Sequence, residues 1–248
     1  MTTSRLSPLP GAHESVDDAQ AAALAARWRT LLALGLATAP RSRQQALGPS
    51  DAGHPCDRRL AYQWAGTLPV NFGDPIKATV GNGVHHVFAE GLRRLVELGA
   101  HLSVEAKTTF RNVSGTYDVY DQETGDLIDW KTTTKARLTK YRKDGPPGQY
   151  VTQLRLYAAG LANEGVTVKR LALIFVPTDG TLNDLWAWIT FPDHEQAGRA
   201  VDRLDQLAGM RPSEASAQPE RYCGYCPYYS PNSTDLDQSC PGPNQKVA

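Results

Sequence analysis

Two aspartates and a lysine occupy a short stretch in which the sequence predicts two strands joined by a tight turn. Asp118 lies on the first strand, and Asp129 and Lys131 lie two residues apart on the second, so the latter two point to one face. Gly125 supplies the turn residue. Charged groups among apolar neighbours are costly unless they compensate one another or bind a metal. The hairpin at 114–134 is therefore the candidate reactive centre.

Three residues outside the hairpin have spacings that could add to this centre. His85 lies four residues after Gly81 on a predicted helix, and Gln153 and Tyr157 lie at i and i+4 on another, which places them on one helix face. Taken singly, His85 also fits a buried, hydrogen-bonded histidine, Gln153 a surface residue and Tyr157 a core residue. His86 is the alternative to His85 as a ligand.

Taken together, these motifs resemble the PD-(D/E)XK nuclease superfamily and, within it, the RecB-type exonucleases. The resemblance rests on the Gly81–His85 spacing, GTYD at 115–118, DWKT at 129–132 and the Gln153–Tyr157 pair, in the family's order. It implies a restriction-endonuclease-like core that hydrolyses phosphodiester bonds in DNA.

The resemblance also implies a divalent metal site. Carboxylate oxygens are hard ligands that suit Mg²⁺ or Mn²⁺. By the resemblance, the ligands are His85, Asp118, Asp129 and the carbonyl of Trp130, and the imidazole tilts the preference toward Mn²⁺. Glu105 is the reserve ligand if His85 serves another role.

The remaining motif residues are expected to act on the substrate. Lys131 would orient the attacking water or stabilise the charge that develops on the phosphate. The resemblance implies that Gln153 and Tyr157 contact the substrate or brace Lys131.

The four cysteines form a second candidate site. Cys56 stands upstream of the core, and Cys223, Cys226 and Cys240 follow it. Four thiolates suit either a zinc ion or a 4Fe-4S cluster, and the alternative is four unconnected free thiols. The layout resembles the iron–sulfur nucleases, including the CRISPR-associated exonuclease family and the nuclease domain of AddAB-type helicase–nucleases. In these a structural 4Fe-4S cluster ties the two ends of the chain together.

One detail departs from that family pattern. The gap between Cys226 and Cys240 is 13 residues, which is longer than the family leads us to expect. The tail at 209–248 has few apolar residues, so we expect that it does not dock by burial alone and that a cluster held by the cysteines adds stability.

The elements that position these sites follow from periodicity. A helix is predicted at 16–37 and a short one around Cys56. Helical and alternating patterns then follow in the order α-β-β-β-α-β-β-α, which indicates an α/β fold with a mixed central sheet flanked by helices. The predicted ranges are a helix at 76–98, strands at 104–111, 115–121 and 126–132, a helix at 149–162, strands at 169–177 and 185–191, and a helix at 193–208.

Three regions are predicted from this order. Residues 1–75 form an N-terminal helical attachment that carries Cys56, residues 76–208 form the nuclease core, and residues 209–248 form the cysteine-bearing tail. The helix at 76–98 is predicted to bury an apolar stripe that includes Ile76, Val80, Val87 and Leu95.

A basic segment after the Lys131 strand is the candidate DNA contact. Residues 135–143, KARLTKYRK, contain five basic residues and Tyr141, which could stack on a base. The plainer interpretation is a solvated charged loop. Four more arginines could extend the contact: Arg58, Arg59, Arg93 and Arg94.

The bulk composition limits the function class. The chain has 248 residues and zero formal net charge, so DNA binding must rest on a local patch. No apolar run approaches the roughly 20 residues that span a bilayer, and no apolar signal core is present, so we expect a cytoplasmic protein. The leading prediction is a metal-dependent exonuclease acting on single-stranded DNA or DNA ends, with a recombination or CRISPR-adaptation protein as its partner. The alternatives are a non-catalytic DNA-binding or assembly module that holds zinc, and a sequence-specific restriction-type endonuclease.

Overall fold

The computed structural model describes residues 18–37, 47–218 and 220–243. The chain divides into two compact units, residues 1–43 and residues 44–248. Helix α1 (Asp18–Ala37) belongs to the first unit and matches the helix predicted at 16–37, of which residues 16 and 17 lie outside the described part. Its large apolar side chains, such as Trp28 and Leu32, are exposed.

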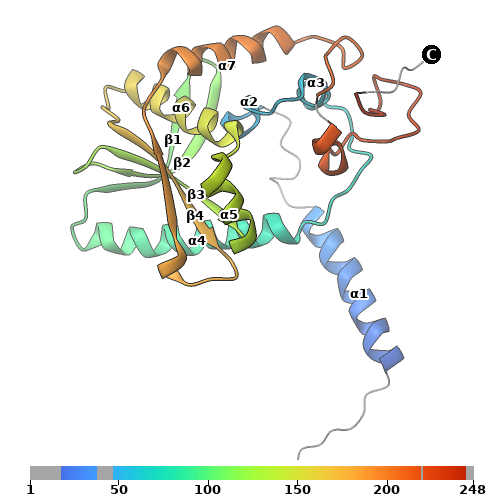
Figure 1. Ribbon diagram of the computed structural model, residues 1–248, viewed down its shortest axis with the longest axis horizontal. Coiled ribbons are helices and arrows are strands. Elements are labelled where there is room, and N and C mark those ends of the chain that lie inside the picture. The colour runs from blue at the N-terminus through green and yellow to red at the C-terminus, as the bar shows by residue number, and fades with distance from the viewer. Residues whose placement is uncertain (1–17, 38–46, 219, 244–248) are drawn as a thin grey trace, which may run out of the picture. The chain divides into compact units, whose positions relative to one another are not determined.

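The second unit is built on a five-stranded sheet whose strands lie in sequence order (Figure 1). The strands are β1 (Leu102–Phe110), β2 (Val113–Asp121), β3 (Asp126–Thr133), β4 (Arg170–Pro177) and β5 (Trp186–Thr190). Strands β3 and β4 pair in parallel and the other neighbours pair antiparallel, so the sheet is mixed, as predicted. The parallel pair requires a crossover, which α5 (Lys135–Asp144) and α6 (Gly148–Asn163) supply.

Helices cover both faces of this sheet, because successive side chains of β3 contact different helices. The Trp130 ring meets Phe88 of α4 (Ile76–Glu97) edge to face, with centroids 5.3 Å apart. Its neighbour Lys131 points the other way and donates to Gln153 of α6 at 2.9 Å. Helix α7 (His194–Leu207) packs against α6, away from the sheet. The largest buried apolar side chains between these layers are Phe175, Leu127, Leu154, Leu156, Leu171 and Leu173.

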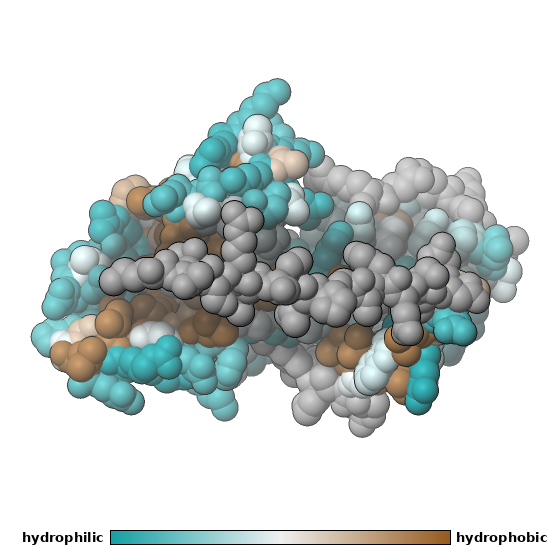
Figure 2. All heavy atoms as spheres, turned by 90° about the horizontal axis from the view of Figure 1, so that it is seen from below, coloured by the Kyte–Doolittle hydropathy of each residue, from teal (hydrophilic) through white to brown (hydrophobic). Residues whose placement is uncertain are grey.

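The predicted apolar stripe of α4 is only partly buried. Ala89 is buried, whereas Ile76, Val80, Val87 and Leu95 are between 43% and 60% exposed. A helix lying along a sheet buries only the strip that faces the strands, and this stripe is wider than that strip. Figure 2 shows brown, hydrophobic patches among hydrophilic residues on the side of the molecule on which α4 lies.

The basic segment predicted as irregular is the helix α5. Thr134 caps it by accepting a hydrogen bond from the Arg137 backbone N–H at 3.3 Å, and Leu138 is its buried residue. With one buried residue in ten, the segment lacks the periodicity by which helices are recognised. The other short helices are α2 (Pro49–Ala52), α3 (Asp57–Trp64), η2 (Leu182–Asp184) and η3 (Glu220–Tyr225).

The structure thus confirms the α/β class and each strand and long helix of the core, with every boundary within two residues of its predicted position. Within the described residues, no helix combines the length and the apolarity needed to cross a membrane.

Candidate active site

The two strands of the central hairpin, β2 and β3, stop pairing where Asp118 and Asp129 lie. The ladder between β2 and β3 runs from Asp121 and Asp126 to Val119 and Ile128, and no pair follows. Asp118 is the next residue on β2 beyond this point, and its Oδ2 accepts a hydrogen bond from the backbone N–H of Trp130 at 2.7 Å. A side chain thus replaces the missing ladder partner, which satisfies a backbone donor that would otherwise be unpaired.

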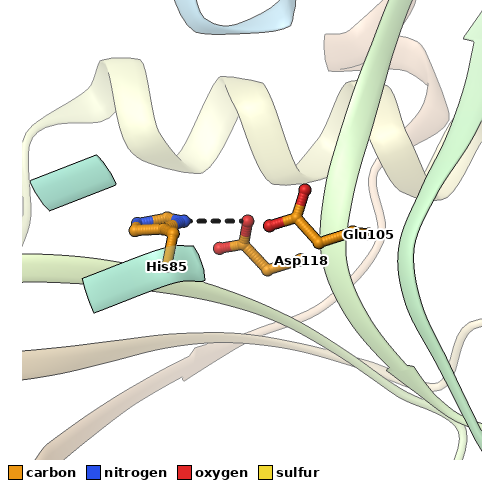
Figure 3. Close-up of side chains that lie close together, drawn as sticks. All are labelled: His85, Glu105 and Asp118. Carbon is orange, nitrogen blue, oxygen red and sulfur yellow. Dashed lines mark hydrogen bonds and ion pairs between the residues drawn. The ribbon is translucent and has the colours of Figure 1, made fainter. Parts of the chain in front are cut away.

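Three side chains from three elements converge beside this gap (Figure 3). His85 comes from α4, Glu105 from β1 and Asp118 from β2, and their ligand atoms lie within 4.8 Å of one another. His85 Nδ1 lies 3.1 Å from Asp118 Oδ1. Two carboxylates and an imidazole at this spacing form a donor set that suits a hard divalent cation. Glu105, predicted as a ligand only if His85 serves another role, therefore lies in the same group as His85. The alternative ligand His86 points away: its side chain is 70% exposed and pairs with Glu90.

Glu105 has an unusual backbone. It lies opposite Asp118 in the β1–β2 register, between the pairs Val104–Val119 and Ala106–Tyr117, and its φ is +49°. A positive φ is uncommon for residues other than glycine, costs on the order of 1–3 kcal/mol, and concentrates at functional sites. The sequence carries no signal for this conformation.

The other motif residues form a second chain of contacts that leads from β3 to α6, and Asp129 and Lys131 still interact electrostatically with His85. Lys131 Nζ lies 2.6 Å from Asp129 Oδ2 and donates to Gln153 Oε1 at 2.9 Å. Gln153 Nε2 then donates to the Tyr157 hydroxyl at 3.0 Å. Asp129 is 2% exposed, and its Oδ2 has no hydrogen-bond partner of suitable geometry within the described residues. The charge of Lys131, and to a smaller extent that of His85, therefore compensates this buried carboxyl group.

The pKa values of Asp129 and His85 are both raised, but for different reasons. Burial raises the pKa of Asp129 against the opposing charge of Lys131. The hydrogen bond to Asp118 raises the pKa of His85, and burial opposes that rise. Negative charge is thus concentrated among Glu105, Asp118 and Asp129, and a bound cation would relieve it.

Two glycines allow the helices and strands around the site to pack closely against one another. A Cβ on Gly81 would lie 3.3 Å from Thr132 Oγ1, so α4 can approach β3 and present His85 one turn later. A Cβ on Gly115 would lie 2.7 Å from Pro49 and 2.8 Å from the Tyr157 ring. The glycines of the predicted motifs therefore serve close packing around the site.

The four cysteines line one pocket, although Cys56 is far from the others in sequence. None forms a disulfide. The long gap before Cys240 is a loop that returns, since Cys240 forms a parallel bridge with Tyr229 and its backbone N–H donates to Tyr228 O at 2.7 Å. The unusual spacing therefore does not separate Cys240 from the other three.

Polar donors surround these sulfur atoms. The backbone N–H groups of Gln218 and Gly242 donate to Cys56 Sγ at 3.5 Å and to Cys240 Sγ at 3.4 Å. The Arg58 guanidinium lies 3.8 Å from Cys240 Sγ. Such donors favour thiolates, the form in which cysteine binds metals. Arg59 also lines the pocket, and its buried Nε has no hydrogen-bond partner within the described part of the chain.

The tail is also attached by contacts that do not involve sulfur. Tyr62 of α3 stacks on Tyr228 with centroids 4.8 Å apart, and both are buried with Cys240. The Tyr62 hydroxyl donates to Leu236 O at 2.5 Å, and Arg58 Nε reaches the carbonyl of Ala215 at 3.1 Å. Aromatic stacking and buried hydrogen bonds therefore add to whatever the thiols bind.

The basic residues do not form one surface. On α5, Lys135 pairs with Asp184 at 3.1 Å, Arg142 lies over the Trp186 ring, and the Tyr141 ring lies against Phe175. Arg58 and Arg59 lie at the cysteine pocket, and Arg93 and Arg94 are exposed on α4.

Comparison with known proteins identifies the class of protein to which this chain belongs. The family model of the PD-(D/E)XK nuclease superfamily matches residues 13–230, so the chain belongs to that superfamily. Nucleases of this superfamily use divalent metals, in agreement with the group at His85, Glu105 and Asp118. No curated protein sequence matches the chain.

Several solved structures resemble the fold at low identity. SSO0001 is 14% identical with a TM-score of 0.48, over 75% of this chain and 84% of that one. The alkaline exonuclease LHK-Exo from Laribacter hongkongensis is 14% identical with a TM-score of 0.47, over 68% and 89%. A phage-related exonuclease from Haemophilus somnus 129PT is 16% identical with a TM-score of 0.42, over 62% and 78%.

Proposed function

We propose that the protein is a metal-dependent DNA exonuclease that acts on single strands or DNA ends. One observation carries the proposal: the group of His85, Glu105 and Asp118 and the chain from Asp129 through Lys131 to Gln153 meet where β2 and β3 separate. Superfamily membership supports the nuclease activity, and the motif set shared with RecB-type exonucleases supports attack at DNA ends.

His85, Glu105, Asp118 and Asp129 would hold Mg²⁺ or Mn²⁺, with the Trp130 carbonyl as a further ligand. The N–H and C=O of one strand residue point to the same side, so the carbonyl of Trp130 faces the gap into which its N–H donates. The burial of Asp129 and the interaction of its carboxyl group with Asp118 and His85 support its role as a ligand. When bound, such an ion stabilises charge on the phosphate and lowers the pKa of water.

Lys131 would act on the reacting phosphate or on the water. Asp129, Gln153 and the ring face of Tyr150, 4.8 Å away, fix its ammonium in place. A cation held in this way stabilises negative charge that develops on the phosphate without having to reorganise. Gln153 positions Lys131, and Tyr157 positions Gln153.

Digestion of linear and circular DNA tests the activity. We expect the wild type to degrade an end-labelled linear single strand with Mn²⁺ or Mg²⁺ and to spare a closed circle of the same sequence. Lys131→Ala should lower kcat by at least about 100-fold, whereas Lys107→Ala, which removes an exposed lysine from β1, should not. Cleavage of the circle would indicate an endonuclease, and DNA binding without cleavage would indicate a non-catalytic module.

We further propose that Cys56, Cys223, Cys226 and Cys240 hold a structural 4Fe-4S cluster. In this proposal residues 1–75 and the tail at 209–248 are regions joined through the cluster, and residues 76–208 are the nuclease core. The shared pocket, the absence of disulfides and the N–H donors to sulfur support it.

Zinc and a 4Fe-4S cluster both take four thiolates, so the sulfur ligands alone do not separate them. The layout of one cysteine before the core and three after it, which resembles the iron–sulfur nucleases, supports the cluster.

Metal analysis and one variant test the cluster. Anaerobically purified protein should absorb near about 400 nm and contain iron and acid-labile sulfide. Cys223→Ser should lose this absorbance, and limited proteolysis should then remove the tail. Tyr225→Ala, at an 80% exposed site in the same segment, is the matched control. Stoichiometric zinc without iron would overturn the cluster, and a stable tail in metal-free protein would overturn its structural role.

A further inference from the structure

A second pocket lies beside the reactive centre, and the mechanism above does not use it. Its volume is about 480 Å³, and it is formed by the first turns of α4, the end of β3, α5 and the start of α6. Among the described residues it is lined by four threonines, two tyrosines, one lysine, one arginine and three apolar residues, none of which carries a carboxylate. A pocket with cations, hydroxyls and aromatic rings but no acid suits an anionic ligand that also has a flat apolar part.

This pocket lies next to Lys131. Thr132, the next residue on β3, lines it, and so does Tyr150, whose ring lies 4.8 Å from Lys131 Nζ. A polymer that places one phosphate at Lys131 would therefore place a neighbouring unit in the pocket.

The cations that line the pocket are free of carboxylate partners. Neither Lys77 nor Arg137 forms an ion pair within the described residues. The other basic residues of α5 are engaged or lie elsewhere: Lys135 pairs with Asp184, and Arg142 lies over Trp186. Arg137 is thus the basic residue of α5 that lines this pocket.

Two aromatic residues form one wall. The Tyr141 ring lies against Phe175 with centroids 5.1 Å apart, and its hydroxyl interacts with Arg137 and Tyr150. Burial holds the pKa of both tyrosines above the ordinary value, so both hydroxyls stay protonated and can donate at neutral pH. On α4, Ile76 and Val80 line the pocket and are 53% and 43% exposed.

We propose that this pocket binds the nucleotide adjacent to the scissile phosphate of the DNA substrate. Arg137 and Lys77 contact its phosphate, threonine hydroxyls contact the sugar–phosphate oxygens, and the base lies against the tyrosine wall and the apolar turns of α4. These groups read the backbone and the face of a base, so binding is independent of sequence. The inference rests on the proposed nuclease function and adds a binding subsite to it.

Salt-dependent binding tests the phosphate contact. The full chain in EDTA, which prevents hydrolysis, is titrated with a fluorescein-labelled single strand of about 20 nucleotides, and Kd is measured by anisotropy at several salt concentrations. Arg137→Ala should weaken binding by about 5- to 20-fold and reduce the slope of log K against log salt by about 0.7. Lys143→Ala removes an exposed cation that does not line the pocket from the same helix, and its slope should match the wild type.

A filling variant tests the pocket without changing charge. Ala78→Phe places a ring in the pocket and should raise KM by at least about fivefold with little change in kcat. Val87→Phe, at a 60% exposed site on the same helix outside the pocket, should leave KM unchanged. If the wild type neither binds nor digests DNA, the proposed function fails. If it digests DNA while Arg137→Ala and Ala78→Phe match their controls, the subsite alone is wrong.

Discussion

The backbone N–H of Trp130 donates to Asp118 Oδ2 at 2.7 Å, across the point where β2 and β3 part. The same carboxylate meets His85 through its other oxygen at 3.1 Å. Asp118 therefore joins the end of the β2–β3 ladder to the helix that carries the imidazole. A change at this residue affects both the charge of the site and the connection between its elements.

Asp118→Asn should weaken metal binding while keeping the fold. The amide oxygen can still accept the Trp130 hydrogen bond, but the negative charge is lost, so Mn²⁺ affinity should fall at least about tenfold. Isothermal titration of the DNA-free protein with Mn²⁺ measures this affinity. Glu123→Gln removes a charge from an exposed position next to the hairpin turn and is the control. Equal affinities for both variants would remove Asp118 from the metal site.

Glu105→Gln tests whether the third side chain of the group is a ligand. Its carboxylate lies within 4.8 Å of the ligand atoms of His85 and Asp118, so neutralising it should lower Mn²⁺ affinity by about tenfold, as for loss of one hard ligand. The same titration measures the effect, and His86→Gln on the exposed face of α4 is the matched control. Unchanged Mn²⁺ affinity would leave Glu105 as a strand residue with an unusual φ and no ligand role.

Two glycines in helix interiors should respond in opposite ways to the same substitution. A Cβ on Gly160 of α6 would lie 2.3 Å from Thr108 Oγ1, so Gly160→Ala should destabilise the protein by about 1–3 kcal/mol. A Cβ on Gly198 of α7 would meet no atom of another element within 4 Å, so Gly198→Ala should stabilise the protein by roughly 0.5–1 kcal/mol. Urea unfolding of both variants measures the two free energies, and equal signs would contradict the packing of α6 on β1.

The ion pair that links β3 to β4 should give a pH-dependent contribution to stability. Arg170 donates to both Asp126 oxygens at 2.6 Å, and these hydrogen bonds lower the pKa of Asp126. A carboxyl group whose pKa is lower in the folded protein stabilises the fold above its unfolded pKa, and that stability is lost as pH falls through the folded value. Asp126→Asn should therefore destabilise at neutral pH and become equal to the wild type in acid.

Solvent screening keeps this effect small, so a double-mutant cycle is the appropriate measurement. Thermal unfolding of wild type, Asp126→Asn, Arg170→Met and the double variant between neutral pH and about pH 3 gives the coupling free energy. A coupling that does not change with pH would exclude the ion pair as its source.

The sequence predicted most of the fold because the core elements have strong periodicity. The continuous apolar strand β4 and the helix α7, with Ala197, Val201 and Leu204 buried at helical spacing, were both recognisable. Helix α5 was not, because its single buried residue, Leu138, leaves no pattern, and its first turn depends on a local cap at Thr134. Local hydrogen bonds of this kind have no periodic signature.

The site was predictable where motif spacing determines neighbours and unpredictable where strand register does. The i, i+4 relation of Gln153 and Tyr157 follows from helix geometry, and the hydrogen bond between them agrees with it. The approach of Glu105 to Asp118 depends on the register of β1 against β2 and on a positive φ, neither of which the residue types indicate. The pocket around Arg137 likewise requires elements that meet only in the folded protein.

The separation of the four cysteines along the chain has a consequence for biosynthesis. Cys56 leaves the ribosome before the whole nuclease core, and Cys223, Cys226 and Cys240 leave after it. All four line one pocket only when α3 and the tail have come together. During translation the core must therefore emerge, and can begin to fold, before the thiols can share a ligand, so delivery of the proposed 4Fe-4S cluster would be the last step of maturation.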